Sequence, residues 1–373
     1  NRPEMVPSLF LALPGLVGEI DFLCNDPAFG DLSNSDNRQR ESRDHALTMA
    51  IDLTGSFDDY WAGRSKKLIQ NIGRYERRAQ SDGMDMRMEC ISNGIALDAA
   101  VARYAELEFS GWKGKLGTAV TMRDVQGKFY LDLMRRFAGT HGACVYELWF
   151  GEHLAASRLC LTSARGTVVM LKTTYDELLS KYSPGRLLLH HVIQDAFQRN
   201  PGGKIEFYTD ANSDQRAWST HQRWIRHVSV YRNDVASDLY SLLRAGRKAL
   251  RWRSPKVLAS NDSTDPGRIE VFKHPGELPK DVAKLFADAE STSIEFGLTW
   301  YQNLVNTVYP GNTEIRFYVM RRAGQPVAAI PVLINRDWLG KKAQALANFY
   351  SALYAPVLDP TLKAHELAVS YTH

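Results

Sequence analysis

Residues Leu171–Leu189, LKTTYDELLSKYSPGRLLL, decide how this chain folds. The β-branched and apolar residues 167–171 lead into them and predict a strand. Ser183 suits a helix N-cap, and Pro184 suits the first helical position, where its missing N–H costs no helical hydrogen bond. The apolar residues that follow have the spacing of one helix face: Leu189, Val192, Ile193, Ala196 and Phe197. The stretch therefore predicts a strand, a tight turn and an open helix start.

This helix start predicts a binding site for a diphosphate group. Gly185 has no Cβ, so a ligand can approach its backbone closely. The N–H groups of Gly185, Arg186 and Leu187 are expected to be free, where the helix dipole favours an anion. The candidate site is therefore Tyr182–Leu187. Lys172, at the strand end, is expected to neutralise phosphate charge; its alternative is a solvated strand edge.

The flanking sequence predicts a mixed α/β (α+β) fold. Helices are expected over residues 57–80, 97–109, 127–140, 214–224 and 235–251, and strands over residues 84–91, 143–150, 153–161, 166–172, 204–209 and 227–231. Residues 254–267 have the composition of a linker. We therefore expect one domain over residues 1–253 and a second, partial unit over residues 268–373.

The second unit is expected to repeat the front of the first. Phe129-Tyr130 matches Trp300-Tyr301, and the strand–turn–strand around Gly151 matches one around Gly324. The alternative is a chance match between two amphipathic helix–hairpin units.

The bulk composition limits the kinds of protein that this chain can be. Its 373 residues suffice for two domains, and its net charge of +4 is too small to imply DNA binding. Its apolar runs are too short for a membrane helix, which needs about 20 residues. We interpret Met5–Val17 as a buried strand, with a signal peptide as the alternative. The four cysteines lack metal-site spacing, so we expect reduced thiols in a cytoplasmic protein.

Three groups of residues occur in the order of a known family: a helix with Tyr60-Trp61, Arg64, Leu68, Asn71-Ile72, Arg74-Tyr75 and Arg77-Arg78, a loop Gly111-Trp112-Lys113-Gly114 with Gly117-Thr118-Ala119, and the segment Lys172–Leu188. Together they resemble the GNAT-type acyltransferases of the branch linked to bacterial cellulose and exopolysaccharide biosynthesis, which is similar in fold to the Fem-type aminoacyl transferases. The resemblance covers residues 50–231 and, more weakly, residues 268–356.

The resemblance implies a GNAT-like mixed sheet flanked by helices. Acyl-coenzyme A would lie in a splayed notch between the central strands, with its diphosphate on Tyr182–Leu187. The Ser-Pro-Gly turn departs from the family's glycine-rich turn. Asp210 and Trp218 match the family on the acceptor side, but the glycine that usually follows the aspartate is absent.

Several side chains are candidates for acid–base catalysis. Asp176 and Glu177 follow the central strand and are candidate bases; their alternative is to cap the next turn. Glu147 lies among apolar residues of a hairpin strand, where a buried carboxylate would suit a base near neutral pH, unless it faces outward. Tyr182 and Tyr175 are candidate proton donors to a leaving thiolate, and Tyr175 is also a candidate cofactor contact.

The acceptor and metal predictions are more local. Glu108, Trp112 and Lys113 are candidate acceptor-binding residues, and a tight turn anchored by the tryptophan is the alternative. We expect no metal, because side chains of adjacent helical residues diverge by about 100°, so that His190 and His191 should not share a ligand face.

The sequence leaves three functions open. The preferred one is an acyl-coenzyme A-dependent N-acyltransferase that acts on an amine, such as one on a sugar or polysaccharide precursor, by direct attack on the thioester. One alternative is a tRNA-dependent Fem-type aminoacyl transferase that uses the basic helix face of Arg64–Arg78. The other is a catalytically inert scaffold in polysaccharide assembly. A homo-oligomer and a polysaccharide-synthesis partner are both compatible with these functions.

Overall fold

The computed structural model describes residues 10, 18–30, 32, 39–140, 142–235, 237–238, 268–337, 340–347, 351 and 353–359. The chain divides into two compact units. The larger unit consists of residues 47–223 and 290–312, and the smaller unit of residues 1–46, 224–289 and 313–373. These boundaries differ from the expected ones at residues 253 and 268. The expected linker over residues 254–267 and most of the helix expected over residues 235–251 lie outside the described residues, so the linker stays a prediction.

A mixed sheet forms the centre of the larger unit. Its strands are β3 (Met86–Ile91), β4 (Ala143–Phe150), β5 (His153–Thr162), β6 (Thr167–Tyr175) and β7 (Lys204–Glu206), followed by β2 (Arg40–Asp52) and β8 (His221–Tyr231), which both continue into the smaller unit. The strand order is β1-β8-β2-β7-β6-β5-β4-β3, where β1 is Glu19–Asn25. Neighbours from β3 to β6 are antiparallel, whereas β6 and β7 are parallel.

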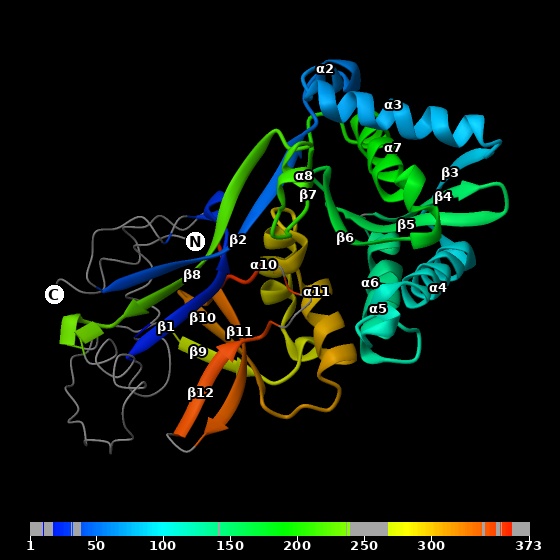
Figure 1. Ribbon diagram of the computed structural model, residues 1–373. Helices are drawn as coiled ribbons and strands as arrows, with labels where there is room; N and C mark the ends of the chain where they lie inside the picture. Colours follow the sequence, from blue (N-terminus) through cyan, green and yellow to red (C-terminus); the bar gives the residue numbers. More distant parts are fainter. Residues whose placement is uncertain are drawn as a thin grey trace. The chain divides into compact units, whose positions relative to one another are not determined.

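Helices cover both faces of this sheet, as Figure 1 shows, with α3 and α7 on one face and α4 and α6 on the other. The helical elements of the larger unit are α2 (Phe57–Ala62), α3 (Lys66–Ser81), α4 (Gly94–Ser110), α5 (Trp112–Lys115), α6 (Val125–Thr140), η3 (Glu177–Tyr182), α7 (Pro184–Arg199), α8 (Ser213–Arg216), η5 (Ile294–Phe296), α11 (Leu298–Asn303) and η6 (Leu304–Val308). The predicted mixed sheet flanked by helices is confirmed.

The core between α3, α7 and the sheet is apolar. Ile72 of α3 and Val192 and Ile193 of α7 are buried in one cluster with Tyr146 and Leu148 of β4. Burial of each such side chain contributes about 1.5–3 kcal/mol, so this layer holds α3 and α7 onto the strands.

Two expected helices differ from the observed ones. The helix expected over residues 57–80 is two helices, because Ser65 caps a new one: its side chain accepts a hydrogen bond from the Leu68 N–H at 3.3 Å. The helix expected over residues 214–224 ends at Arg216, because the residues from His221 onward pair as strand β8.

The smaller unit contains a second sheet. The elements of the smaller unit are β1 (Glu19–Asn25), η2 (Pro27–Phe29), β9 (Arg268–Phe272), η4 (Pro275–Glu277), α10 (Lys280–Glu290), β10 (Ile315–Arg322), β11 (Gln325–Asp337), β12 (Gly340–Ala345) and β13 (Val357–Leu358). The order β12-β11-β10-β9 is antiparallel throughout, and β13 pairs with β11. Arg321 of β10 forms ion pairs with Glu270 and Asp281.

The residues of the expected repeat occupy comparable elements. Phe129 lies in α6 and Trp300 in α11, and their rings meet edge-on with centroids 5.6 Å apart. The Asn303 side chain donates a hydrogen bond to the Phe129 carbonyl at 3.1 Å. Both helices thus belong to the larger unit, whereas the β10–β11 hairpin belongs to the smaller one; a partial GNAT-like second unit stays a prediction.

The cysteines are not all free. Cys90 of β3 and Cys144 of β4 form a disulfide, whereas Cys24 and Cys160 are free. Sequence spacing missed this pair because the two residues lie 54 positions apart and meet only when β3 and β4 pair. Among the described residues, no helix has the length and apolar character that crossing a membrane requires.

Candidate active site

Strands β6 and β7 separate after a short parallel pairing, which leaves a notch in the hydrogen-bond ladder of the sheet. The two strands pair over only three positions, from Thr167 with Lys204 to Val169 with Glu206. Strand β6 then continues to Tyr175, beyond the end of β7. Parallel strands that part in this way leave an edge of β6 without a neighbour, in the place where a ligand can bind between them.

The start of α7 lies just beyond this notch. Ser183 is the N-cap, as predicted, but it adopts a left-handed conformation with φ of 49° and its side chain makes no capping bond. The N–H groups of Arg186 and Leu187 both donate to the Ser183 carbonyl, so the prediction that they are free is wrong. Within the described chain, the Gly185 N–H is left without an acceptor. The helix start therefore offers one amide rather than three.

Cationic side chains surround this helix start. Tyr75 of α3 hydrogen-bonds with Ser183, which lowers the pKa of Tyr75, and the nearby Arg186 and Arg74 lower it further, against the effect of burial. Arg186 also forms an ion pair with Asp214. Positive charge thus compensates for the lost amides at the place where an anion would bind.

The residues between β6 and α7 mostly support the turn. Asp176 caps η3 through the Leu178 N–H at 2.8 Å and contacts His153 Nε2 at 2.6 Å. Glu177 accepts a hydrogen bond from the Trp112 N–H at 2.9 Å. Buried Tyr182 donates to Asp82 at 2.6 Å.

Tyr175 and the first residues of α7 are packed more closely than the sequence suggests. The Tyr175 ring lies 3.4 Å from the place that a Cβ on Gly185 would take. Pro184 and Leu187 are buried. The backbone of Gly185 and the side chain of Tyr175, which is 42% exposed, are therefore the parts of this turn that a ligand could reach.

Lys172 lies in a polar cluster beneath α4 and α6 rather than at a solvated edge. Its Nζ lies 5.6 Å from the ring centroid of Tyr130. Burial lowers the pKa of Lys172, while Glu108 raises it and Lys113 lowers it. Predicted donor and acceptor residues thus meet at this point.

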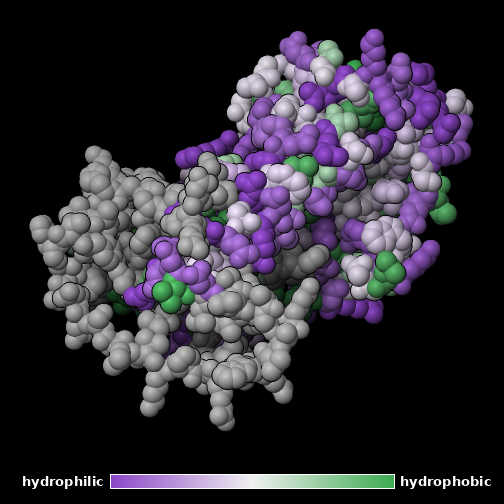
Figure 2. Space-filling model, turned by 60° about the vertical axis from the view of Figure 1, so that its left-hand side comes forward, coloured by the Kyte–Doolittle hydropathy of each residue, from purple (hydrophilic) through white to green (hydrophobic). Residues whose placement is uncertain are grey.

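Glu108 organises that cluster. Its carboxylate is 1% exposed and accepts hydrogen bonds from Tyr104 at 2.9 Å, from Lys113 at 2.5 Å and from the Val120 N–H at 2.8 Å. These bonds hold α5 and the segment that follows it against α4. Trp112, by contrast, is 53% exposed and available to a ligand. In Figure 2, the hydrophobic residues of the described surface appear as small separate green spots among hydrophilic ones.

Three other predicted site residues make contacts that support the fold. Glu147 is fully buried, and its oxygens accept hydrogen bonds from Arg103 at 3.0 and 2.9 Å and from Trp149 at 3.2 Å. Trp218 is 1% exposed, and its carbonyl accepts the Tyr60 hydroxyl at 2.6 Å. Asp210 accepts the Leu47 N–H at 3.1 Å. The structure does not bring these three residues together with the Lys172 cluster.

Sequence reasoning missed Arg158 of β5. It is 6% exposed and lies opposite Tyr146 and Thr173 in the sheet register. Its Nε has no hydrogen-bond partner, and none of the described carboxylates forms an ion pair with it. Burial lowers its pKa. A buried cation without a counter-ion is a candidate to bind an anionic group, and its strand position gave no signal of that.

Comparison with known families matches residues 66–216 to the acetyltransferase (GNAT) domain. This range includes α3, the sheet from β3 to β7, and α7. Comparison with curated protein sequences gives no match.

Three solved structures show low similarity to this chain. A C-terminal domain (DUF2156) ascribed to a lysylphosphatidylglycerol synthetase of Agrobacterium fabrum has 11% identity and a TM-score of 0.38, covering 56% of this chain and 66% of that one. FemX has 8% identity and a TM-score of 0.38, covering 54% and 64%. L-PGS from Bacillus licheniformis has 10% identity and a TM-score of 0.34, covering 55% and 67%. The chain spans slightly less than two thirds of the first two. Residues 66–216 of this chain are thus similar to the GNAT-type acetyltransferase domain.

Proposed function

We propose that the larger unit is an acyl-coenzyme A-dependent N-acyltransferase. The observation that carries this proposal is the separation of β6 from β7 after Val169, directly before the start of α7. An extended thioester donor fits such a notch with its diphosphate at the helix and its arm along the free edge of β6.

The diphosphate end of the donor would lie at Ser183–Leu187. The Gly185 N–H supplies one hydrogen bond and the dipole of α7 a partial positive charge. Arg74 and Arg186 add full charges. In this proposal Asp176 and Glu177 support the turn, because both side chains are engaged in hydrogen bonds at the phosphate end.

The acyl end would lie further back along β6, beside Lys172. An amine nitrogen attacks the thioester carbon, the C–N bond forms, the C–S bond breaks, and the amine loses one proton as the thiol is released. The oxygen gains negative charge during this step, which the ammonium group of Lys172 would stabilise. The acceptor would enter over α5, where Trp112 is exposed and Lys113 contacts Glu108. An amine on a sugar or polysaccharide precursor fits this polar entrance.

Titration calorimetry with acetyl-coenzyme A tests the donor site. Gly185→Glu places a carboxylate where the diphosphate would lie and is expected to abolish micromolar binding. Gly185→Ala is the matched control, because its Cβ would meet only the edge of Tyr175 at 3.4 Å. Equal heats from the Glu variant and the wild type, or no binding by the wild type, would contradict the proposal.

A second measurement separates donor binding from chemistry. Lys172→Met is expected to slow thiol release from acetyl-coenzyme A in the presence of an amine panel while leaving the affinity for acetyl-coenzyme A unchanged. Tight donor binding without thiol release with any amine would favour the scaffold alternative.

One observation favours the tRNA-dependent alternative. Lys66, Lys67, Arg74, Arg77 and Arg78 are exposed on α3, whereas Arg64 donates to the Ser219 carbonyl at 2.5 Å. If this face binds RNA, affinity for tRNA should fall steeply with salt and with charge removal at Arg77 and Arg78. Salt-insensitive or absent tRNA binding would exclude that function.

A further inference from the structure

We infer that Glu76, His190 and His191 form a binding site for a divalent transition-metal ion such as Zn²⁺. Glu76 lies on α3, and the two histidines lie side by side on α7. One ligand atom from each residue lies within 4.8 Å of the other two. This grouping is independent of the acyltransferase proposal.

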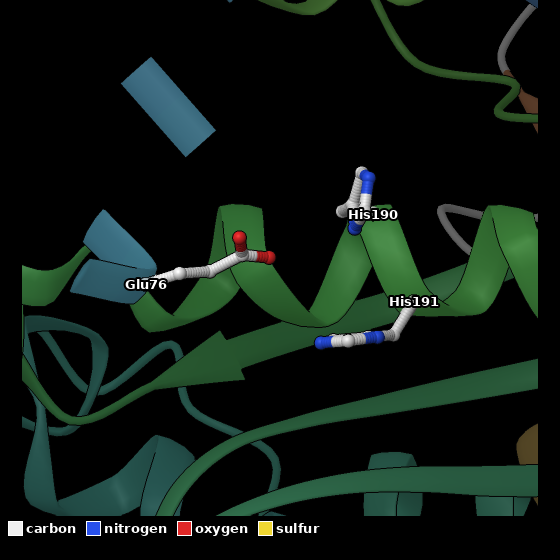
Figure 3. A group of neighbouring side chains, drawn as sticks. All are labelled: Glu76, His190 and His191. Carbon is white, nitrogen blue, oxygen red and sulfur yellow. The ribbon is translucent and has the colours of Figure 1, made fainter. Parts of the chain in front are cut away.

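The ligand atoms of His190 and His191 lie close together although adjacent side chains on a helix point in different directions. Figure 3 shows the Glu76 side chain extending from α3 toward α7, where both imidazole rings are found. The His190 and His191 ring centroids are 5.5 Å apart, at an interplanar angle of 74°. A third candidate ligand, Glu76, lies on another helix within reach of both rings, so in this proposal the two histidines serve one site although adjacent helical side chains diverge.

The potential ligand atoms are not used up by the protein. His190 Nδ1 is buried and has no hydrogen-bond partner. Among the described residues, the Glu76 carboxylate forms neither an ion pair nor a hydrogen bond. A buried nitrogen without a hydrogen bond costs free energy of folding. Because this nitrogen lies near the Glu76 carboxylate, the pair points to a bound cation, which would accept a lone pair from each group.

Neighbouring side chains fix the positions of the two imidazole rings. Phe57 and Trp61 pack against His190, with ring centroids 5.3 and 4.5 Å away. His191 hydrogen-bonds with Gln194, the kind of outer contact that orients a metal-binding histidine. Neutral imidazole is the form that binds metals.

Two nitrogen ligands and one carboxylate suit Zn²⁺, with water in the fourth position. Ligand atoms in a tetrahedral zinc site are about 3.4 Å apart, so the three side chains would rotate inward on binding. The ion would then join the third turn of α3 to the second turn of α7.

Cobalt titration of untagged, metal-free protein tests this site. Tetrahedral Co²⁺ absorbs visible light far more strongly than hydrated Co²⁺, and we expect this absorption to saturate at one ion per chain. Glu76→Gln, His190→Gln and His191→Gln are each expected to remove it. His221→Gln is the matched control, because His221 lies in the same unit beside Asp52 and outside the cluster.

Thermal unfolding provides the second measurement. Zn²⁺ is expected to raise the Tm of the wild type by several degrees and that of the three variants by none. Circular dichroism establishes which variants are folded, and any one folded variant suffices for the comparison. Absent absorption in the wild type, or equal absorption in a folded variant, would overturn the inference.

Discussion

The two faces of the sheet in the larger unit treat polar groups differently. On the face covered by α4 and α6, Glu147 and Glu108 are buried and their oxygens are engaged by donors. On the face covered by α3 and α7, the core is apolar. Among the described residues there, His190 Nδ1 has no hydrogen-bond partner and the Glu76 carboxylate has neither a hydrogen bond nor an ion pair. A satisfied buried charge supports the fold, whereas an unsatisfied group is available to a ligand. The comparison thus separates structural groups from candidate binding groups.

The largest effect is expected from breaking the satisfied face. Arg103→Met leaves the fully buried Glu147 carboxylate without its cation and should lower the free energy of unfolding by about 3 kcal/mol. Urea denaturation measures this change.

An exposed pair in the same layer provides the control. Arg135 binds Asp98 through two bonds of 2.8 Å, but its side chain is 54% exposed. Arg135→Met should therefore cost only about 0.5 kcal/mol. Similar losses in the two variants would remove the distinction between buried and exposed pairs.

A smaller effect is expected from protonation on the other face. Burial lowers the pKa of His190 from 6.5 to about 4, with a smaller contribution from His191. The unfolded chain thus binds a proton below pH 6.5 that the folded chain resists, so stability is present above pH 6.5 and is lost as pH falls toward 4. The full pKa shift corresponds to about 3 kcal/mol, which the partial exposure of His190 reduces to about 2 kcal/mol, and His190→Gln should reduce this loss in metal-free buffer. A pH–stability profile unchanged by this substitution would contradict the assignment to His190.

The smallest effect concerns the N-cap residue of α7. Ser183 has φ of 49°, a conformation that costs a residue with a Cβ about 1 kcal/mol. Ser183→Gly should therefore be about 1 kcal/mol more stable than Ser183→Ala, since both lose the hydroxyl contact with Tyr75. Calorimetric unfolding of the two variants measures the difference, and equal Tm values would show that the backbone is relaxed.

Sequence reasoning succeeded where local pattern decides structure. The hairpin of residues 143–150 and 153–161 was predicted almost to the residue, because alternating strands flank Gly151. It failed where tertiary contacts decide: β8 takes up residues of an expected helix, and Ser65 divides another. The spacing of apolar residues along the chain does not show which distant strand or local cap will decide the structure of a segment.

The candidate site shows the same limit. The helix start at Pro184 was predicted correctly, but the left-handed Ser183 and its use of two amides were not. Glu147 was a candidate base and Trp218 a candidate acceptor-binding residue, because the sequence shows the type of a residue but not the hydrogen bonds that already engage it. Glu76 and His190 lie 114 positions apart, so only the packing of α3 against α7 reveals their proximity.

The path of the chain through the two units has a consequence for truncation and evolution. The backbone passes from one unit to the other after residues 46, 223, 289 and 312. A fragment ending at Arg223 would lose Trp300 and Asn303, which contact Phe129 of α6. The larger unit therefore cannot be excised as a single contiguous piece with its packing intact. Loss of residues 290–312 would remove side chains that pack against α6.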